Sequence, residues 1–237
     1  SILCILIDQA IRYRGKEISV VAESVPSLRR GALKDFIGIL QGLSRYKESQ
    51  FNRTTLKYTF TNGSYIEFFS TDQPDKLRGS RRTTLFINEC SNIPFSAYGE
   101  LSIRTSEVVW LDYNPTHLFW VDKEVIGQPD TDYITLTYKD NDALSPTIVK
   151  EIEKARDKAK TSTYWENWWN VYGLGLQGTL SGACIPDWKE IDNIPQEARL
   201  LNYGMDFGYS IDHLHLLHFI NGIMLTYLMR CYIKQEC

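Results

Sequence analysis

Apolar strand-like runs alternate with helix-like segments along most of this chain, and that alternation restricts the folds it can adopt. Residues 17–22, 83–87 and 107–111 are mostly apolar runs typical of buried strands. Apolar residues at helical spacing precede and separate them, as in residues 2–13 and 27–43. Strands that alternate with helices predict a mainly parallel sheet with helices on both faces. The sequence therefore predicts an α/β fold.

A β-hairpin is predicted around Asn62-Gly63, because apolar and polar residues alternate on both sides of it. In such a turn both central residues are expected at positive φ. The other elements predicted up to residue 172 are helices at 95–104, 118–126 and 162–172, a strand at 133–138, and a long charged helix that begins with Ser145 as its cap and Pro146.

A change of character near residue 175 predicts a domain boundary. Four glycines between residues 173 and 182, followed by Pro186 and Pro195, interrupt the pattern of regular elements. We therefore expect one domain at 1–175 and the beginning of a second at 176–237, which opens with an antiparallel meander. The first residues read as the middle of a helix and the last as a strand without a closing element. The expectation is a segment of a longer protein.

Composition excludes several classes of protein. The chain is 43% hydrophobic and 23% charged, as folded domains are, and no apolar run is long enough to span a bilayer. Its five cysteines are scattered without a CxxC pair, which argues against a disulfide framework or a zinc ribbon and favours a reducing cytosol. A net charge of −3 argues against a wholly basic nucleic-acid binder but leaves room for a local basic groove.

Polar residues follow three of the predicted strands, at Glu23-Ser24, Asn88-Glu89 and Asn114. Ligands of open α/β sheets bind outside the carboxyl ends of the strands, so these residues are candidates for a site. Ordinary loop polarity is the alternative interpretation.

The Asn88-Glu89 pair suggests hydrolysis of a nucleotide. A carboxylate at the end of a buried strand is held rigidly, and in P-loop hydrolases it orients the water that attacks the γ-phosphate. Mg²⁺ is normally held through the preceding acid; Asn88 can orient a metal-bound water but contributes no charge. By itself the LFINE string is a weak signal, since many buried strands end in Glu.

Two further residues are weaker candidates, and one motif is missing. Asn114 would suit a γ-phosphate sensor, although alone an Asn-Pro turn is the simpler interpretation. Arg78 would reach phosphates or lie in a solvated basic loop that also carries Arg81 and Arg82. The phosphate loop GxxxxGK[ST] does not occur in the 237 residues.

A second kind of chemistry is predicted in the meander. Asp206 lies within its first strand and Asp212 follows six residues later. Strand carboxylates of ribonuclease-H-like nucleases hold Mg²⁺ or Mn²⁺ for phosphodiester hydrolysis. His213, His215 and His218 form an HxHxxH cluster that would bind a transition metal or make up a half-exposed face of the hairpin, which is the more common arrangement.

Aromatic residues at helical spacing mark residues 162–172. Tyr164, Trp168 and Tyr172 share one stripe, with Trp165 and Trp169 beside it. Such a stripe is usually core packing, which we expect here; stacking on nucleic-acid bases is the alternative.

Six stretches in the same order resemble the large terminase subunit of tailed bacteriophages and prophages, in the branch grouped with the PBSX-type terminases. Each stretch is modest alone, and their shared order makes the resemblance specific. They are VVAESVPSLRRGALKDF, NGSYIEFFS, KLRG before TTLFINECSNI, VWLDYNPT, TYKDNDALSP and YGMDFGYSID.

The resemblance implies a two-part motor. Its first part is a P-loop NTPase-type (ASCE) ATPase that pumps DNA into an empty procapsid, and its second a ribonuclease-H-like nuclease that cuts concatemeric DNA. Glu89 matches the ATPase catalytic acid, with Asn88 where many relatives have Asp, and Asn114 lies in the coupling motif. Asp206 matches the first metal-binding acid of the nuclease, and Asp212 matches a recurrent second acid.

The resemblance also implies cofactors and partners. The cofactors are ATP with Mg²⁺ in the first part and Mg²⁺ or Mn²⁺ in the second. The partners are double-stranded viral DNA, the small terminase subunit and the portal of the procapsid, on which the subunits form a homo-oligomeric ring. The place of action is the cytoplasm of an infected or lysogenic bacterial host, without a membrane.

Departures from the family pattern limit the expected activity. The Walker A lysine and the later nuclease acids do not occur, and the family's Asp-Pro appears as Asp212-His213. The 237 residues alone are therefore expected to be inactive. Two competing hypotheses are another P-loop DNA translocase or helicase, which leaves the Asp206 hairpin unexplained, and a non-catalytic prophage remnant that serves as an assembly module.

Overall fold

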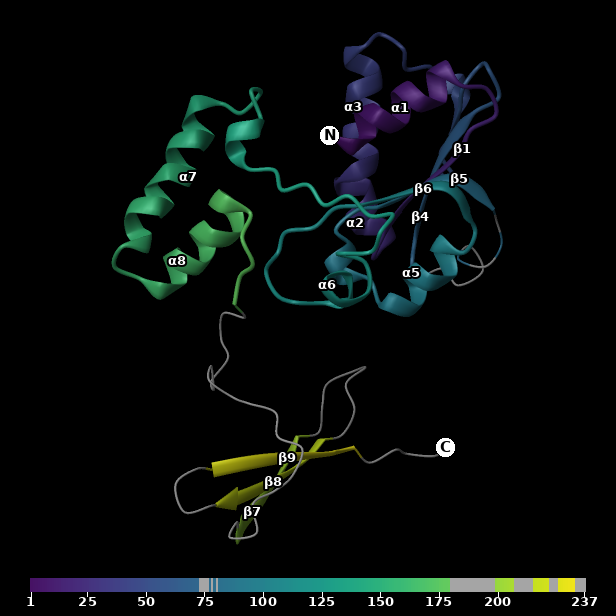
Figure 1. The fold of residues 1–237 in the computed structure, drawn as a ribbon. Coiled ribbons are helices and arrows are strands. Elements are labelled where there is room, and N and C mark those ends of the chain that lie inside the picture. The colour runs from purple at the N-terminus through teal and green to yellow at the C-terminus, as the bar shows by residue number, and fades with distance from the viewer. Residues whose placement is uncertain are drawn as a thin grey trace. The chain divides into compact units, whose positions relative to one another are not determined.

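The computed structural model describes residues 1–72, 77, 79 and 81–179, together with the backbone of 199–206, 215–221 and 226–232 (Figure 1). The chain forms two compact units, Ser1–Gly182 and Ala183–Cys237, and each is considered by itself. The predicted division into domains at 1–175 and 176–237 stays a prediction.

A six-stranded sheet, in the order β2-β3-β4-β1-β5-β6, organises the first unit. Four neighbouring strands are parallel, and β3 and β2 continue the sheet in antiparallel pairing. This sheet confirms the predicted mainly parallel α/β fold. The strands are β1 (Glu17–Ala22), β2 (Phe51–Asn52), β3 (Lys57–Thr59), β4 (Tyr65–Ser70), β5 (Arg82–Ile87) and β6 (Thr105–Leu111).

Helices cover both faces of this sheet, because alternate residues of each strand point to opposite sides. In β1, Val20 packs into a cluster with α1, α2 and α3, whereas Val21 packs into a second cluster with α5 and α6. The helices are α1 (Ile2–Arg12), α2 (Val25–Arg30), α3 (Ala32–Gly42), α5 (Phe95–Ser102) and α6 (Trp120–Glu124), with short 3₁₀ turns η1 (Glu48–Gln50) and η2 (Cys90–Asn92).

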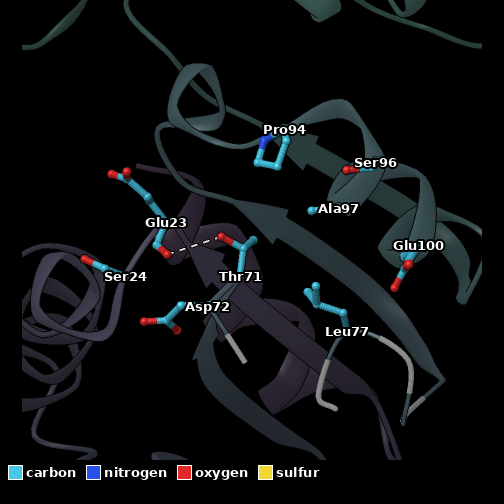
Figure 2. A pocket seen from close by; sticks show the side chains of 9 residues that line it. All are labelled: Glu23, Ser24, Thr71, Asp72, Leu77, Pro94, Ser96, Ala97 and Glu100. Carbon is cyan, nitrogen blue, oxygen red and sulfur yellow. Dashed lines mark hydrogen bonds between the residues drawn. The ribbon is translucent and has the colours of Figure 1, made fainter. Parts of the chain in front are cut away.

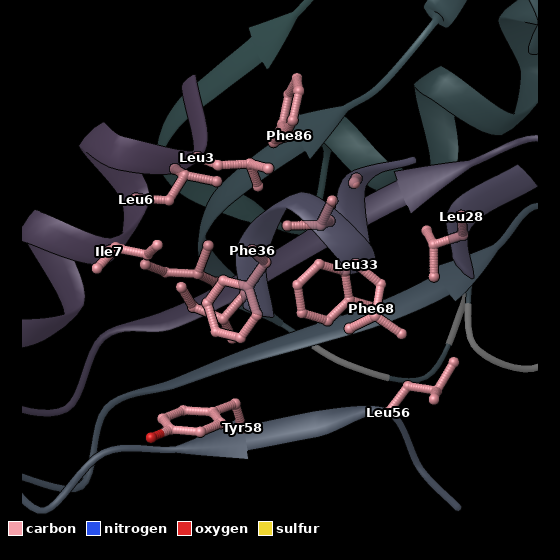
Figure 3. Packing of buried hydrophobic residues seen from close by; sticks show 14 of the residues in the cluster. Leu3, Leu6, Ile7, Leu28, Leu33, Phe36, Leu56, Tyr58, Phe68 and Phe86 are labelled. Atoms are coloured by element: carbon pink, nitrogen blue, oxygen red, sulfur yellow. The ribbon is translucent and has the colours of Figure 1, made fainter. Parts of the chain in front are cut away.

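Aromatic packing fixes α3 on the sheet. The Phe36 ring lies 5.5 Å from the Tyr58 ring and 5.1 Å from the Phe68 ring, centroid to centroid (Figure 3). All three side chains are buried. The Tyr58 hydroxyl donates to Gln50 Oε1 at 2.7 Å, so its burial leaves no unsatisfied polar group.

The predicted hairpin forms between β3 and β4, but its turn differs from the expectation. Gly63 has φ 88°, whereas Asn62 is not among the non-glycine residues at positive φ. Asn62 is held instead by its side chain, whose Nδ2 donates to the carbonyl oxygens of Ala10, Ile11 and Tyr13 at 2.9, 3.1 and 3.1 Å. These bonds tie the hairpin turn to the end of α1.

The single helix predicted at 27–43 is wrong, because the chain breaks at Gly31 into α2 and α3. Gly31 has φ −101° and ψ −108°, outside the helical region. The first of these two helices also begins before residue 27: Ser24 is the N-cap of α2, and its hydroxyl accepts the Ser27 N–H at 3.4 Å. Ser24 therefore has a structural role at the end of β1.

Arg82 and residues 133–138 also differ from their predictions. Arg82 is not in a solvated loop: its side chain is 2% exposed, at the start of β5, and donates to Ser19 Oγ and the Leu101 carbonyl at 3.0 and 2.9 Å. Residues 133–137 do not form a strand, and Ile134 and Leu136 are 69% and 72% exposed. The segment pairs with no described strand, so its β-prone composition alone does not produce a strand.

A helical pair completes the first unit. It consists of α7 (Pro146–Ala159), α8 (Thr163–Trp168) and a π-helical turn, η4 (Trp169–Gly173). Ser145 caps α7 as predicted, because its hydroxyl accepts the Ile148 N–H at 3.4 Å. The core-packing prediction for the aromatic stripe is wrong: α8 has no buried residue, and Tyr164 and Tyr172 are 58% and 43% exposed.

The described strands of the second unit form an antiparallel sheet in the order β7-β8-β9. This pairing confirms the predicted meander. The strands are β7 (Arg199–Asp206), β8 (His215–Asn221) and β9 (Thr226–Tyr232).

Candidate functional site

Three of the parallel strands bring polar residues to one edge of the first sheet. In the parallel registers of β1, β5 and β6, Val21 pairs with Ile87, and Ile87 pairs with Leu111. The residues that follow these strands are therefore neighbours. They are Glu23 after β1, Asn88 and Glu89 after β5, and Asp112 and Asn114 after β6.

Asp112 joins the ends of β5 and β6. Its Oδ1 accepts the Glu89 backbone N–H at 2.7 Å, and its two carboxylate oxygens accept from Asn88 Nδ2 at 3.1 and 3.2 Å. Burial raises the pKa of Asp112 above its ordinary value, and the bonds from Glu89 and Asn88 act in the opposite direction. Asp112 is not among the site residues predicted from the sequence.

Glu89 lies on a sharp turn and faces solvent. Its backbone is left-handed, with φ 55° and ψ 54°. The side chain is exposed, and within the described part of the chain no hydrogen bond or ion pair to its carboxylate is found. Glu89 is thus a carboxylate on a rigid turn at the carboxyl end of a fully buried strand segment, free to meet water or a ligand.

Asn88 points toward the face of the sheet that α1, α2 and α3 cover. A Cβ atom placed on Gly31 would lie 3.8 Å from Asn88 Oδ1, so this oxygen faces the break between α2 and α3. Because Nδ2 donates to Asp112, the amide has one defined orientation. The Asn88 amide is therefore fixed through its nitrogen by Asp112, and its oxygen points toward the break between α2 and α3.

Asn114 lies in the loop that follows Asp112. Its side chain is exposed, and its carbonyl accepts the Thr116 N–H at 2.8 Å. The next residue, Pro115, is buried, and its carbonyl accepts the Gly178 N–H at 2.7 Å. The structure thus brings Asn88, Glu89 and the Asn114 loop to one edge, with Asp112 between them.

For the other predicted site residues, the structure describes either the backbone alone or nothing. Arg78, Asp212 and His213 lie outside the described residues. Asp206 is the last residue of β7, where its backbone is paired in register with His215. Its role, like that of His215 and His218, stays a prediction.

A pocket of about 490 Å³ lies at the Glu23 end of this edge (Figure 2). Neither Asn88, Glu89 nor Asn114 lines it. Within it, Thr71 Oγ1 donates to the Glu23 carbonyl at 3.2 Å, which joins the ends of β4 and β1. The lining residues are Glu23, Ser24, Thr71, Asp72, Leu77, Pro94, Ser96, Ala97 and Glu100.

Among the described residues, no group of three or more His, Cys, Asp or Glu side chains is arranged to hold a metal ion. In the same part of the chain, every helix is too short or too polar to cross a membrane.

Comparison with known proteins identifies the family. The sequence profile of the family described as phage terminase large subunit matches residues 5–168. The chain belongs to the phage terminase large subunit family. A search of curated protein sequences found no match. The assignment to the PBSX-type branch stays a prediction.

Solved structures of large terminases share the fold of this terminase chain. The large terminase of a thermophilic bacteriophage has a TM-score of 0.60 at 16% identity, covering 97% of this chain and 59% of that one. The same thermophilic phage enzyme has also been solved with ADP and with ATP-gamma-S. The HK97 bacteriophage large terminase has a TM-score of 0.50 at 13% identity and covers 97% of this chain. The chain spans 59% or less of each of these two proteins.

Proposed function

We propose that the first unit is an ATPase unit of a DNA-packaging motor, and that Glu89 is its catalytic carboxylate. The observation that carries this proposal is the exposed Glu89 carboxylate on a fixed turn at the end of buried β5, in a chain of the terminase family. A carboxylate held in this way can accept a proton from water that attacks a γ-phosphate. The nucleotide complexes of the thermophilic phage terminase support the proposal that the first unit binds a nucleotide.

The remaining site residues have supporting roles in this proposal. Asn88 offers its amide oxygen to a metal-bound water, Asn114 senses the γ-phosphate, and Arg78, which precedes β5 in the sequence, contacts the phosphates. A phosphate loop of the GxxxxGK[ST] kind would have to act together with this chain, since the 237 residues do not contain one.

Mg²⁺ fits the oxygen donors of this edge. Mg²⁺ keeps several waters and binds through one or two protein oxygens and the substrate phosphates, so a cage of protein ligands is not required. The Asn88 amide oxygen would hold the ion through a bound water, which leaves the Glu89 carboxylate free for the attacking water. The bound ion would neutralise charge on the phosphates.

We further propose that the second unit opens a ribonuclease-H-like nuclease. Asp206 would be its first ligand for Mg²⁺ or Mn²⁺ and Asp212 a second one. Hard carboxylate oxygens suit both ions. The antiparallel β7-β8-β9 sheet, which ends its first strand at Asp206, supports this proposal.

The proposed partners follow from the family. They are double-stranded viral DNA, the small terminase subunit and the portal of the procapsid, on which the subunits would form a homo-oligomeric ring in the host cytoplasm. The remaining alternative is a prophage remnant without activity.

Replacing Glu89 tests the ATPase assignment. In the full-length terminase, we expect Glu89→Gln to lower DNA-stimulated ATP turnover by about 100-fold or more, because general acid–base groups contribute on that scale. Nucleotide affinity should stay within about threefold, since the amide keeps the size of the side chain and removes only its charge. Turnover is measured by phosphate release and affinity with a fluorescent nucleotide.

Glu166→Gln, at an exposed position of α8, is the control and should leave both quantities unchanged. Undiminished turnover in Glu89→Gln would remove Glu89 from its role. A wild-type protein without any turnover would favour the remnant.

A further inference from the structure

Asp112 is in contact with the Glu89 turn from both its side chain and its backbone. The carboxylate accepts the Glu89 N–H at 2.7 Å. The Asp112 carbonyl accepts the Cys90 N–H at 2.9 Å, and the Asp112 N–H donates to the Ile87 carbonyl at 3.3 Å. The chain from residue 87 to 90 is thus attached to the residue that directly follows the neighbouring strand β6.

The turn needs such an attachment. Glu89 is one of three non-glycine residues at positive φ among the described residues. For an ordinary side chain the left-handed conformation costs about 1 kcal/mol or more, so it persists only where surrounding contacts stabilise it. The Glu89 N–H donates to the Asp112 carboxylate, and a charge-assisted hydrogen bond of this kind is stronger than one between neutral groups.

The same carboxylate explains the amide at position 88. Asn88 Nδ2 lies 3.1 and 3.2 Å from the two Asp112 oxygens, so position 88 must supply a hydrogen-bond donor. A carboxylate there would face a second carboxylate at hydrogen-bond distance, which is unfavourable for both. Asn88 and Asp112 are therefore a matched pair, with the negative charge on the residue after β6 rather than on the residue after β5.

We propose that Asp112 is a positioning residue for the proposed hydrolysis: it holds the Glu89 turn in the left-handed conformation and orients the Asn88 amide. The inference rests on the proposed function of Glu89 as catalytic acid. It assigns to Asp112 no contact with the nucleotide. Its effect is on where the Glu89 carboxylate and the Asn88 oxygen point.

An exchange of the two side chains tests this pair in the full-length terminase. In Asp112→Asn, the new amide either presents its NH₂ to that of Asn88 or gives up the bond from the Glu89 N–H. In Asn88→Asp, two carboxylates face each other. We expect each single variant to lower the turnover number at least tenfold with the Michaelis constant within about threefold, because positioning acts on the chemical step.

The double variant Asn88→Asp/Asp112→Asn should recover turnover to within about threefold of wild type. In it the new carboxylate at position 88 accepts from the new amide at position 112, whose oxygen can still accept the Glu89 N–H. Such recovery is a coupling between the two positions, which separate effects on stability do not produce. Asp140→Asn is the control, because the Asp140 carboxylate also accepts a backbone N–H, that of Thr137 at 2.8 Å, on an exposed turn.

Hydrogen exchange of the Glu89 amide gives a readout that is independent of ATP. We expect its protection to fall in both single variants and to return in the double variant. A double variant no better than the worse single variant, in exchange and in turnover, would overturn the inference. A wild-type protein that hydrolyses no ATP would refute the proposed function, whereas the exchange pattern would still show whether Asp112 sets the turn.

Discussion

Cys90 follows the Glu89 turn directly, and the environment of its thiol predicts a low reactivity. The thiol is buried, and burial raises its pKa from 9.0 to about 12, with the charge of Asp112 adding to the effect. At pH 8 the thiolate, which is the reactive form, is therefore about a thousandfold scarcer than for an exposed thiol. We expect a thiol reagent at pH 8 to modify the exposed Cys4 and to leave Cys90 intact, as measured by mass spectrometry of the peptides.

Denaturant should make both thiols equally reactive, and fast modification of Cys90 in the folded protein would contradict its burial. The raised pKa also sets a pH dependence. The unfolded thiol ionises near pH 9 and the folded one near 12, so its contribution to stability is complete below pH 9 and is lost as the pH rises toward 12.

Single residues could be predicted from the sequence where the signal is local. The position of Glu89 at the end of a buried strand was predictable because the apolar run of residues 83–87 precedes it, whereas its role stays a prediction. Asp112 was not identifiable, because its bond to Asn88 crosses from one strand to the next, 24 residues along the chain. The available signal was an acid directly after the neighbouring strand. Arg82 was misplaced for a similar reason, since its acceptors on β1 and α5 are distant in sequence.

At the scale of the elements, Asn62 connects the β3-β4 hairpin turn to the end of α1 and is expected to contribute to stability. Its side chain donates to three carbonyls at the end of α1, and its Oδ1 accepts the Ser64 N–H at 3.0 Å. Because Asn62→Ala leaves helix-end carbonyls without this donor, we expect a loss of about 1–3 kcal/mol in the free energy of unfolding. Denaturant titration followed by circular dichroism measures it.

Asn52→Ala is the matched control. Asn52 Oδ1 accepts the N–H groups of Thr54 and Thr55 within one exposed turn, so its loss should cost less. Equal costs for the two variants would show that the contact between the hairpin and α1 contributes nothing beyond the turn.

Element type was predictable where apolar periodicity is strong, and boundaries were not where tertiary contacts decide. The residues of β1 and the Ser145 cap of α7 agree with the sequence pattern. The helix break at Gly31 does not follow from periodicity, since the apolar spacing continues through it. Residues 133–137 show the reverse case, in which a β-prone pattern finds no described partner strand.

In the first unit, the loop after β6 is connected to the helical pair. The Gly178 N–H donates to the Pro115 carbonyl, and a Cβ on Gly178 would lie 2.5 Å from Val171 Cγ2, so only glycine fits there without displacement. Asn167 holds the adjacent Thr179 backbone through bonds of 2.7 and 3.1 Å. The loop that carries Asn114 is thereby fixed to η4 and α8. No local sequence signal indicates this connection.

The two compact units predict two separable activities. Glu89 lies in Ser1–Gly182 and Asp206 in Ala183–Cys237. If Asp206 is a metal ligand of the proposed nuclease, Asp206→Ala in the full-length terminase should reduce Mg²⁺- or Mn²⁺-dependent DNA cleavage by about 100-fold or more, because the metal activates the attacking group. ATP turnover should stay within about twofold. Asp8→Ala, at an exposed position of α1, should change neither activity, as measured by plasmid cleavage and phosphate release. Loss of cleavage and turnover together in Asp206→Ala would instead mean that Asp206 supports the folding or coupling of both units, and the assignment of a separate metal site to β7 would be withdrawn.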